Sequence, residues 1–397
     1  MRDLFLTIGF PPDVGGIQRL IFEVAKRFKN PIVVTRYFPN ADEFDAKLND
    51  FTIYRNSAKH GLLYKTLFVV SPFFAWFFEN KKNIDLAFKS NEISRVHCAH
   101  IFTALSGLYA KYRYGVPYTL IVHCQEVFPF YYPGYNPLAW FLRNLVLKKA
   151  DHIFTITNKM ADYLGQTVER SKITVIPLAA DPELFKPMPK DKALLKKYNL
   201  VGKKVVLTTS RFEPYKGIDK TLEAIAKIGD RIPDLKYLIV GDGPDKARLH
   251  KMVSDLNLSS KVIFTGGVPD SDLPKLYNLC DVYILANRDL PLDGQLGGYG
   301  LVLFEANACE KPVVVGKAQY FDDEVIVGKG GLIVDPLNTQ EIADALIKIL
   351  NDKEFAKMLG RIGRKQVLEK MNYNEMAKVI QTRIRQNKIG NASDQEL

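Results

Sequence analysis

Residues 284–315, ILANRDLPLDGQLGGYGLVLFEANACEKPVVV, decide the predicted fold of this chain. The apolar ends have the length and composition of buried strands, and between them lie a Gly-rich loop and a helix predicted to start near Gly300. Gly297, Gly298 and Gly300 carry no Cβ, so the backbone there can turn tightly and come close to a ligand. A helix that begins in such a loop presents amide groups and the positive end of its dipole, which suits a phosphate or a polar sugar. Glu305, about one and a half turns into this helix, can reach the hydroxyl groups of such a ligand.

Taken alone, the loop is equally typical of an ordinary helix start that carries a surface glutamate, because Gly-rich loops are common. The rest of the chain alternates strands with helices, which predicts parallel sheets covered by helices on both faces. A chain of 397 residues is expected to form more than one domain. The predicted fold class is therefore α/β, with two doubly wound, Rossmann-like domains facing across a cleft.

The predicted boundary between the domains lies in the irregular, charged and Pro-containing segment 181–204. We expect an N-terminal domain over residues 1–185 and a C-terminal domain over residues 186–372. Residues 373–397 are predicted to form a C-terminal helix that crosses back to the N-terminal domain and ends in a frayed tail.

The formal net charge of +11 is shared by both halves of the chain. It favours an anionic ligand or an anionic membrane surface as partner, whereas nucleic acid is disfavoured because no nucleic-acid-binding module or dense basic stripe is present. The four cysteines are scattered among apolar residues, as is typical of reduced, buried thiols in a cytoplasmic protein. No secretory leader is expected, because the apolar run Leu4–Phe10 has only the length of a strand.

The aromatic stretch LLYKTLFVVSPFFAWFF, residues 62–78, is too interrupted to predict a membrane-spanning helix. Its simplest interpretation is a helix packed on the N-terminal sheet. The alternative is a peripheral membrane contact through residues 62–82, because aromatic side chains near Lys59, Lys65, Lys81 and Lys82 suit lipid headgroups.

The segment SRFEPYKG, residues 210–217, places Arg211 and Lys216 in the loop after a predicted strand. Loops at the carboxyl ends of strands line the ligand crevice of a doubly wound sheet, and two cations there can neutralise a diphosphate. The alternative is that both are ordinary surface cations. Gly15 and Gly16 open a helix in the first half and form a second place where amides can meet an anion.

Two histidines, His100 and His123, end neighbouring predicted strands and can either contact a ligand or serve the structure. His97, Cys98 and His100 lie close in sequence, but strand alternation places their side chains on opposite faces of the sheet. We therefore expect no metal site.

Taken together, these segments resemble the retaining glycosyltransferases of the GT-B fold, the fourth family in the usual numbering, and the resemblance covers nearly the whole chain. The matching segments are PPDVGGIQRL (11–20), VHCAH (96–100), VHCQE (122–126), KITVIPLAADPELFKP (172–187), SRFEPYKG, VGDGP (240–244), VIFTGGVPDSDLPKLYNLCDV (262–282) and YGLVLFEANACEKPVVV (299–315). Within the family, the chain is most similar to phosphatidylinositol mannosyltransferases and other enzymes that build lipid-linked or surface glycans.

The chain departs from the family at one position. The family pattern has two glutamates eight positions apart, of which the second matches Glu305, while the first position holds Gly297. The family's first glutamate binds hydroxyl groups of the transferred sugar, so the departure leaves the identity of the sugar open. Asp293 or Asp289 is the candidate replacement carboxylate.

The resemblance implies metal-independent transfer of a hexose from a GDP-mannose or UDP-sugar donor, without any cofactor, to a lipid-linked or glycan acceptor on the first domain. Arg211 and Lys216 would stabilise the leaving diphosphate, and losing either would cost about 10²–10³ in rate. His123 would orient the sugar and the acceptor. The implied donor-binding residues are Gly15, Gly16, Gly241, Val268, Gly298, Tyr299, Gly300, Leu301 and Glu305.

Two other functions stay open at this point. Gly297 is compatible with a catalytically silent partner subunit that binds a nucleotide and transfers nothing. A GT-B-fold sugar-nucleotide epimerase is the second alternative, although its acid and base carboxylates cannot be located. The expected location is the cytoplasm, with peripheral attachment to the inner face of the plasma membrane if the aromatic stretch binds lipid.

Overall fold

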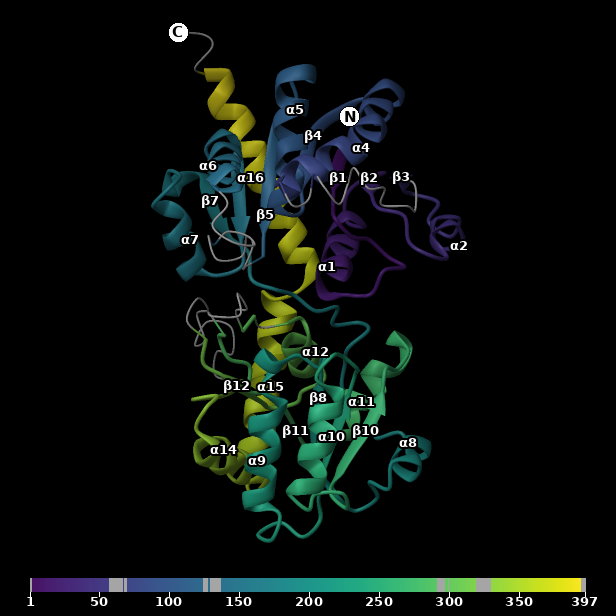
Figure 1. Ribbon diagram of the computed structural model, residues 1–397, viewed down its shortest axis with the longest axis vertical. Helices are drawn as coiled ribbons and strands as arrows, with labels where there is room; N and C mark the ends of the chain where they lie inside the picture. Colours follow the sequence, from purple (N-terminus) through teal and green to yellow (C-terminus); the bar gives the residue numbers. More distant parts are fainter. Residues whose placement is uncertain are drawn as a thin grey trace. The chain divides into compact units, whose positions relative to one another are not determined.

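The computed structural model describes residues 2–56, 67, 70–123, 128, 137–290, 297–298, 300–318 and 330–393, with side chains as far as residue 383. It divides into two compact units, Met1–Pro177 with Tyr373–Leu397, and Leu178–Asn372. Each unit is built on a parallel sheet with helices packed against it (Figure 1).

The described part of the N-terminal unit has a seven-stranded sheet in the order β3-β2-β1-β4-β5-β6-β7. Its strands are β1 (Arg2–Leu6), β2 (Ile32–Thr35), β3 (Thr52–Arg55), β4 (Ile93–Cys98), β5 (Tyr118–Val122), β6 (His152–Thr155) and β7 (Ile173–Val175). Its helices are α1 (Gly16–Ala25), α2 (Ala41–Asp45), α4 (Pro72–Ser90), α5 (Ala104–Tyr114), α6 (Pro137–Lys149), α7 (Asn158–Gly165) and α16 (Tyr373–Ser393).

The described part of the C-terminal unit has a six-stranded sheet in the order β10-β9-β8-β11-β12-β13. Its strands are β8 (Lys204–Thr209), β9 (Leu235–Val240), β10 (Val262–Gly266), β11 (Val282–Leu285), β12 (Val313–Gly316) and β13 (Gly331–Val334). Its helices are α8 (Lys192–Lys197), α9 (Ile218–Ile228), α10 (Lys246–Asp255), α11 (Leu273–Leu279), α12 (Val302–Ala308), α14 (Thr339–Asn351) and α15 (Lys353–Glu369).

The strand sequences follow from their burial. Strands β2 (IVVT), β11 (VYIL) and β12 (VVVG) are buried at every position, as a parallel sheet covered on both faces requires. In the C-terminal unit the hydrophobic core lies between the six-stranded sheet and the apolar faces of α9 and α14. Both sheets thus confirm the predicted doubly wound α/β class.

The last helix, α16, belongs to the N-terminal unit and packs on α1. Arg27, which follows α1, donates to Asn374, and its guanidinium lies 5.4 Å from the ring centroid of Tyr373. Gln381 donates to the backbone oxygen of Arg27 at 3.1 Å. A segment distant in sequence is thereby fixed to the N-terminal unit.

Two predicted details differ from the structure. The segment 181–204, predicted to be irregular, contains the short helix α8, which starts where the Asp191 side chain accepts a hydrogen bond from the amide of Leu194 (3.0 Å). The helix predicted to start near Gly300 begins at Val302. Within the part of the chain that the structure describes, every helix is too short or too polar to reach across a bilayer.

Both sheets reverse their strand order at one place, between β1 and β4 in the N-terminal unit and between β8 and β11 in the C-terminal unit. In doubly wound sheets the ligand crevice lies outside the carboxyl ends of the two strands at this switch point. The loops that follow β8 and β11 hold most of the site residues that the sequence predicts.

Candidate functional site

Two glycines bring three loops of the C-terminal unit into contact at the carboxyl end of its sheet. Gly217 (φ +68°) follows Lys216, and a Cβ there would lie 1.8 Å from the carbonyl oxygen of Ala286. Gly241 (φ +131°) follows β9, and a Cβ there would lie 1.9 Å from the carbonyl oxygen of Ser210. Only glycine fits either position, so the loops after β8, β9 and β11 pack backbone to backbone.

The two predicted cations differ in their surroundings. The Arg211 side chain is 73% exposed, and its Nε lies 3.1 Å from a carboxylate oxygen of Glu213. Lys216 is half-buried, and its ammonium lies 4.8 Å from the ring centroid of Tyr215. Arg211 is therefore accessible to solvent, while Lys216 is held against the protein.

Burial decides the titration of Lys216. It lowers the pKa of the ammonium group from 10.5 to about 8, because a charge is costly where water is excluded, and the nearby charge of Glu213 only partly opposes this. A cation that is poorly solvated in this way interacts strongly with an anion brought next to it.

The Gly-rich loop is fixed by the residues that follow β11. The Nδ2 of Asn287 donates to the carbonyl oxygen of Gly297 (3.0 Å), and the amide of Gly297 donates to a carboxylate oxygen of Asp289 (2.9 Å). A Cβ at position 297 would lie 2.7 Å from the carbonyl oxygen of Arg288. The position that holds a glutamate in the family pattern is thus closed to any side chain here.

The predicted donor residues Gly298, Gly300 and Leu301 follow directly, with Leu301 buried at the start of α12. Glu305 is buried within α12, and its Oε2 accepts a hydrogen bond from the Tyr277 hydroxyl at 2.7 Å. Burial, and next the charge of Glu305, raise the pKa of Tyr277 well above its ordinary value, so the hydroxyl remains protonated.

A short chain of hydrogen bonds links Glu305 to the loop of the cations. The Tyr277 hydroxyl lies 2.8 Å from Oγ1 of Thr209, the last residue of β8, two positions before Arg211. Val268, predicted to receive the base, is half-buried and lies just beyond β10, where the carbonyl oxygen of Gly266 accepts from the amide of Gly241 (3.0 Å). Contacting loops thus carry those predicted residues of the C-terminal unit that the structure describes.

The other predicted residues belong to the N-terminal unit. His123 is buried after β5, and its Nε2 lies 2.9 Å from the carbonyl oxygen of Ala99, beyond the end of β4. Gly15 and Gly16 are exposed at the start of α1. They lie at the carboxyl end of the N-terminal sheet, and at its switch point.

The histidines in β4 and just after it have protein partners. The ring nitrogens of His97 lie 2.8 Å from Thr119 Oγ1 and 3.2 Å from a carboxylate oxygen of Asp3. Nδ1 of His100 accepts from the amide of Phe102 at 3.2 Å. Cys98, which lies between these histidines in the sequence, is buried. Burial raises the pKa of its thiol to about 12.

Two predicted site residues, Asp293 and Tyr299, lie outside the described residues, as does Glu126 of the segment VHCQE. Asp289, the second candidate for the replacement carboxylate, is described, and its contact with Gly297 places it at the Gly-rich loop.

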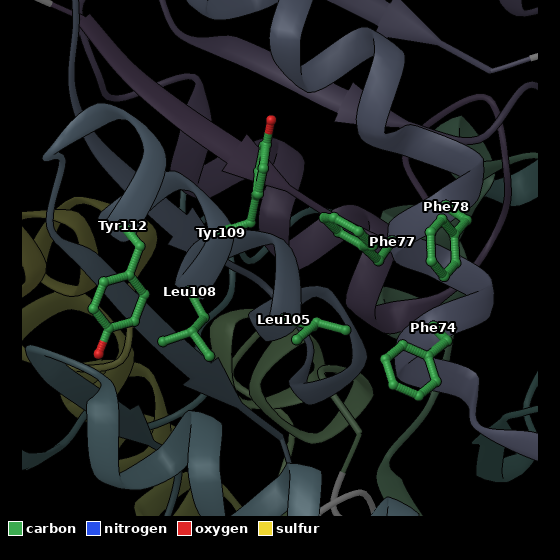
Figure 2. Close-up of a pocket in the computed structure, with 7 residues that line it drawn as sticks. All are labelled: Phe74, Phe77, Phe78, Leu105, Leu108, Tyr109 and Tyr112. Carbon is green, nitrogen blue, oxygen red and sulfur yellow. The ribbon is translucent and has the colours of Figure 1, made fainter.

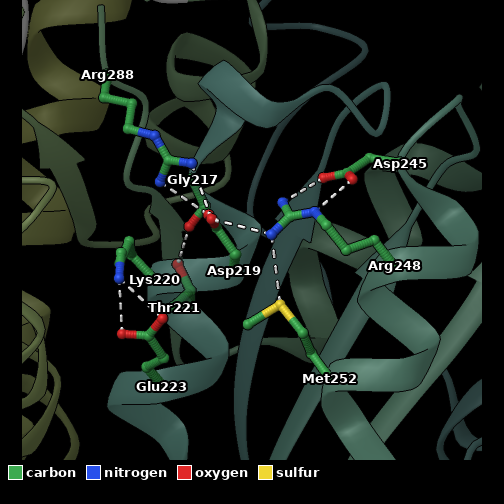
Figure 3. A network of polar contacts seen from close by, with 9 residues as sticks. All are labelled: Gly217, Asp219, Lys220, Thr221, Glu223, Asp245, Arg248, Met252 and Arg288. Atoms are coloured by element: carbon green, nitrogen blue, oxygen red, sulfur yellow. Dashed lines mark hydrogen bonds and ion pairs between the residues drawn. The ribbon is translucent and has the colours of Figure 1, made fainter. Parts of the chain in front are cut away.

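Sequence reasoning missed a network of charged side chains around the buried Asp219, beside this loop (Figure 3). Both nitrogens of the Arg288 fork donate to the Asp219 carboxylate, at 2.9 and 2.8 Å. Arg248 approaches the same carboxylate from α10 at 3.4 Å and makes two 2.6 Å hydrogen bonds to Asp245. The signals in the sequence were the position of Asp219, three residues after Lys216, and the position of Arg288, three residues after the end of the buried strand β11.

A second surface feature lies on the N-terminal unit. Helices α4 and α5 form an apolar hollow of about 290 Å³ (Figure 2). Its lining residues are Phe74, Phe77, Phe78, Leu105, Leu108, Tyr109 and Tyr112. Phe78 is 57% and Tyr112 is 69% exposed, so the hollow opens to solvent on an aromatic surface.

Two family models match the chain. The model of "Glycosyl transferases group 1" matches residues 191–366, and that of "Glycosyltransferase Family 4" matches residues 14–184. Together they extend over both units of the structure.

Two relatives illustrate the similarity in sequence. A GDP-mannose-dependent alpha-(1-6)-phosphatidylinositol monomannoside mannosyltransferase of Mycolicibacterium smegmatis is 34% identical over 195 residues, 49% of this chain and 51% of the relative. The match therefore spans about half the length of that enzyme. A 2-deoxystreptamine glucosyltransferase of Streptomyces kanamyceticus is 26% identical over 72% of this chain and 75% of its own length.

Solved structures resemble the whole chain. The sucrose-phosphate synthase of Thermosynechococcus elongatus has a TM-score of 0.76 at 21% identity, covering 98% of this chain and 99% of its own. HepE of Anabaena, solved with UDP and glucose, has a TM-score of 0.75 at 20% identity, covering 97% of this chain and 100% of its own. These likenesses concern the fold.

Proposed function

Because the chain belongs to the family-4 glycosyltransferases of the GT-B fold, we propose that it transfers a hexose from a nucleoside-diphosphate sugar to a lipid-linked or glycan acceptor. The observation that carries this proposal is the arrangement around Lys216. A poorly solvated cation and the accessible Arg211 share one loop at the switch point, packed against the residues that lead into a Gly-rich loop.

Each residue of the C-terminal unit has a role in this proposal. Lys216 and Arg211 stabilise the negative charge that builds on the diphosphate as its bond to the sugar breaks. Glu305, held by Tyr277, accepts hydrogen bonds from the ribose hydroxyls. Amides at Gly298 and Gly300 steady the sugar, and the backbone near Val268 receives the base.

The stereochemical course we propose is retention. The acceptor hydroxyl attacks the anomeric carbon on the face from which the diphosphate leaves, and an oxygen of the leaving phosphate takes the hydroxyl proton. His123 orients the sugar and the acceptor, and Gly15 and Gly16 close over the phosphates. The reaction so written balances without a metal ion.

The similarity to a GDP-mannose-dependent and to a glucosyl-transferring enzyme supports a hexose donor and leaves GDP-mannose and UDP-sugars as the candidates. We propose that Asp289 or Asp293 contacts the hydroxyls of the sugar in place of the family's first glutamate. The contact of Asp289 with Gly297 supports the first of these.

Contact with a membrane is the remaining part of the proposal. We propose a cytoplasmic protein that docks peripherally on an anionic membrane surface through α4 and its neighbour α5. Exposed aromatic rings at the hollow and the exposed cations Lys82 and Arg113 support such a surface.

A screen of donors tests the proposed activity. The full chain is incubated with GDP-mannose, UDP-glucose and other UDP-hexoses after a thermal-shift screen for binding. Slow hydrolysis of one donor to a free hexose and a nucleoside diphosphate is the expected result. Interconversion of sugar epimers would instead favour an epimerase, and binding without turnover in the presence of acceptor would favour a silent partner subunit.

A further inference from the structure

We propose that Arg288 is a positioning residue that holds the cation loop (residues 211–217) and the Gly-rich loop, at Gly297, in one fixed arrangement for a diphosphate ligand. The ligand part of this proposal rests on the proposed function. The arrangement of the two loops is a property of the chain and can be tested without any ligand.

The first set of contacts joins Arg288 to the cation loop. The backbone amide of Arg288 donates to the carbonyl oxygen of Tyr215 at 2.8 Å, next to Lys216. Two positions before it, Ala286 is the residue against which Gly217 packs. These two backbone contacts fix the register between the loops after β8 and β11.

The second set joins the same segment to the Gly-rich loop. Gly297 lies against the backbone of Arg288, with no room for a Cβ between them. Its carbonyl oxygen accepts from Asn287, and its amide donates to Asp289, so both neighbours of Arg288 hold the same residue. The backbone of residues 287–289 is thus the connection between the two loops.

The Arg288 side chain anchors this connection to a helix. Its planar fork makes two parallel hydrogen bonds to Asp219, a buried residue in the first turn of α9. A bidentate pair of this kind fixes direction as well as distance. Burial alone would raise the pKa of Asp219, but the hydrogen bonds and the charge of Arg288 outweigh it and lower the pKa below its usual value.

Arg248 supplies the matched control within the same network. It contacts the same carboxylate of Asp219, from α10, and its main partner is Asp245. Its side chain contacts Asp219 on α9, Met252 on α10 and Asp245 directly before α10. Removing it disturbs the ion pairs without touching the segment 287–289.

The first experiment follows backbone hydrogen exchange in the full-length chain without ligand. Arg288→Met should speed exchange of the amides at positions 288 and 297 by about tenfold or more, because the first donates to Tyr215 and the second to Asp289. Arg248→Met should leave them unchanged. Arg288→Lys keeps the charge but cannot form the fork, so it should give an intermediate increase in exchange rate. This variant tests the proposal if Arg288→Met fails to fold.

The second experiment measures binding of UDP and GDP by calorimetry. For the nucleotide that binds, Arg288→Met should weaken affinity about 10- to 100-fold, because a small displacement of a positioning contact is costly. Arg248→Met should stay within about twofold. Unchanged loop exchange in Arg288→Met, equal acceleration in both variants, or looser loops with unaltered nucleotide affinity would each overturn the proposal.

These two readouts separate the two ideas. If the unsubstituted chain binds neither UDP nor GDP, the proposed donor site is wrong, while the exchange measurement still decides whether Arg288 holds the loops together. If nucleotide binds and exchange is insensitive to Arg288→Met, the proposed function stands and the positioning role is refuted.

Discussion

At the scale of single residues, the charge of Lys216 depends on its surroundings, because they change the pKa of its ammonium group. Its pKa is lowered to about 8 by burial, whereas an anion bound beside it would raise the pKa again. Binding of a diphosphate therefore requires uptake of a proton above pH 8. Affinity should be constant below this pH and should fall as pH rises through 8, by up to about tenfold per pH unit.

The measurement is calorimetric titration of the binding nucleoside diphosphate between pH 7 and 9.5, about the range in which a lysine of this pKa titrates. Lys216→Arg provides the control, since an arginine stays charged throughout and its affinity should be flat. An identical pH profile for both proteins would show that Lys216 does not titrate against the ligand.

Gly297 is the residue at which the chain departs from its family. The sequence identifies the departure, but it cannot indicate that the backbone of Arg288 occupies the space of a side chain. We expect Gly297→Ala to lower the free energy of unfolding by about 1–3 kcal/mol, because a methyl group there must displace backbone. Urea denaturation measures the change.

The control for this substitution is Gly267→Ala. An added Cβ at Gly267 has no neighbour within 4 Å, so the unfolding free energy should not fall by more than about 0.5 kcal/mol. A Gly297→Ala protein as stable as the unsubstituted chain would mean that the loop can move away from Arg288 freely.

At the scale of elements, α11 and α12 are coupled through Tyr277 and Glu305. Tyr277→Phe removes the hydroxyl that donates to Glu305 and contacts Thr209. We expect a loss of about 1–3 kcal/mol in unfolding free energy, because a buried carboxylate loses a donor. Nucleoside diphosphate binding should weaken as well, since the hydroxyl holds Glu305 in place.

Tyr283→Phe separates the two effects. The Tyr283 hydroxyl donates to the carbonyl oxygen of Thr209 (3.1 Å), whereas the hydroxyl that donates to Glu305 is that of Tyr277. The Tyr283→Phe protein should be less stable in urea denaturation and should keep its nucleotide affinity in calorimetry. Equal loss of affinity in both variants would remove the assignment of Glu305 to the ligand.

The elements were largely predictable from the sequence because their signals are local. Apolar runs such as Val313–Val315 and the periodicity of α15 each lie within one segment. The helix α8 was missed because its signal is a single capping aspartate before a short charged run. The Arg288–Asp219 pair joins residues 69 positions apart, and no local pattern reports which side chain a buried arginine meets.

At the scale of the whole molecule, the net charge of +11 and the exposed aromatic rings on α4 and α5 bear on membrane docking. Aromatic rings enter the headgroup region, and cations gain about 1 kcal/mol each near an anionic surface. The full-length chain should therefore float with vesicles that contain phosphatidylglycerol, and much less with phosphatidylcholine vesicles. Raising the salt concentration should release it, because the charge contribution is screened.

Substitutions of exposed apolar residues decide whether the hollow of Figure 2 is the docking surface. Phe78→Ser and Tyr112→Ser should reduce the floating fraction several-fold while leaving nucleotide affinity unchanged, because neither residue is among those assigned to the nucleotide. Leu368→Ser is the matched control, since Leu368 is 49% exposed on α15 of the other unit. If the floating fraction depends on net charge and is the same after substitution of Phe78 and Tyr112, docking through α4 and α5 is refuted. Nonspecific attraction of a basic protein to an anionic surface needs no aromatic residues.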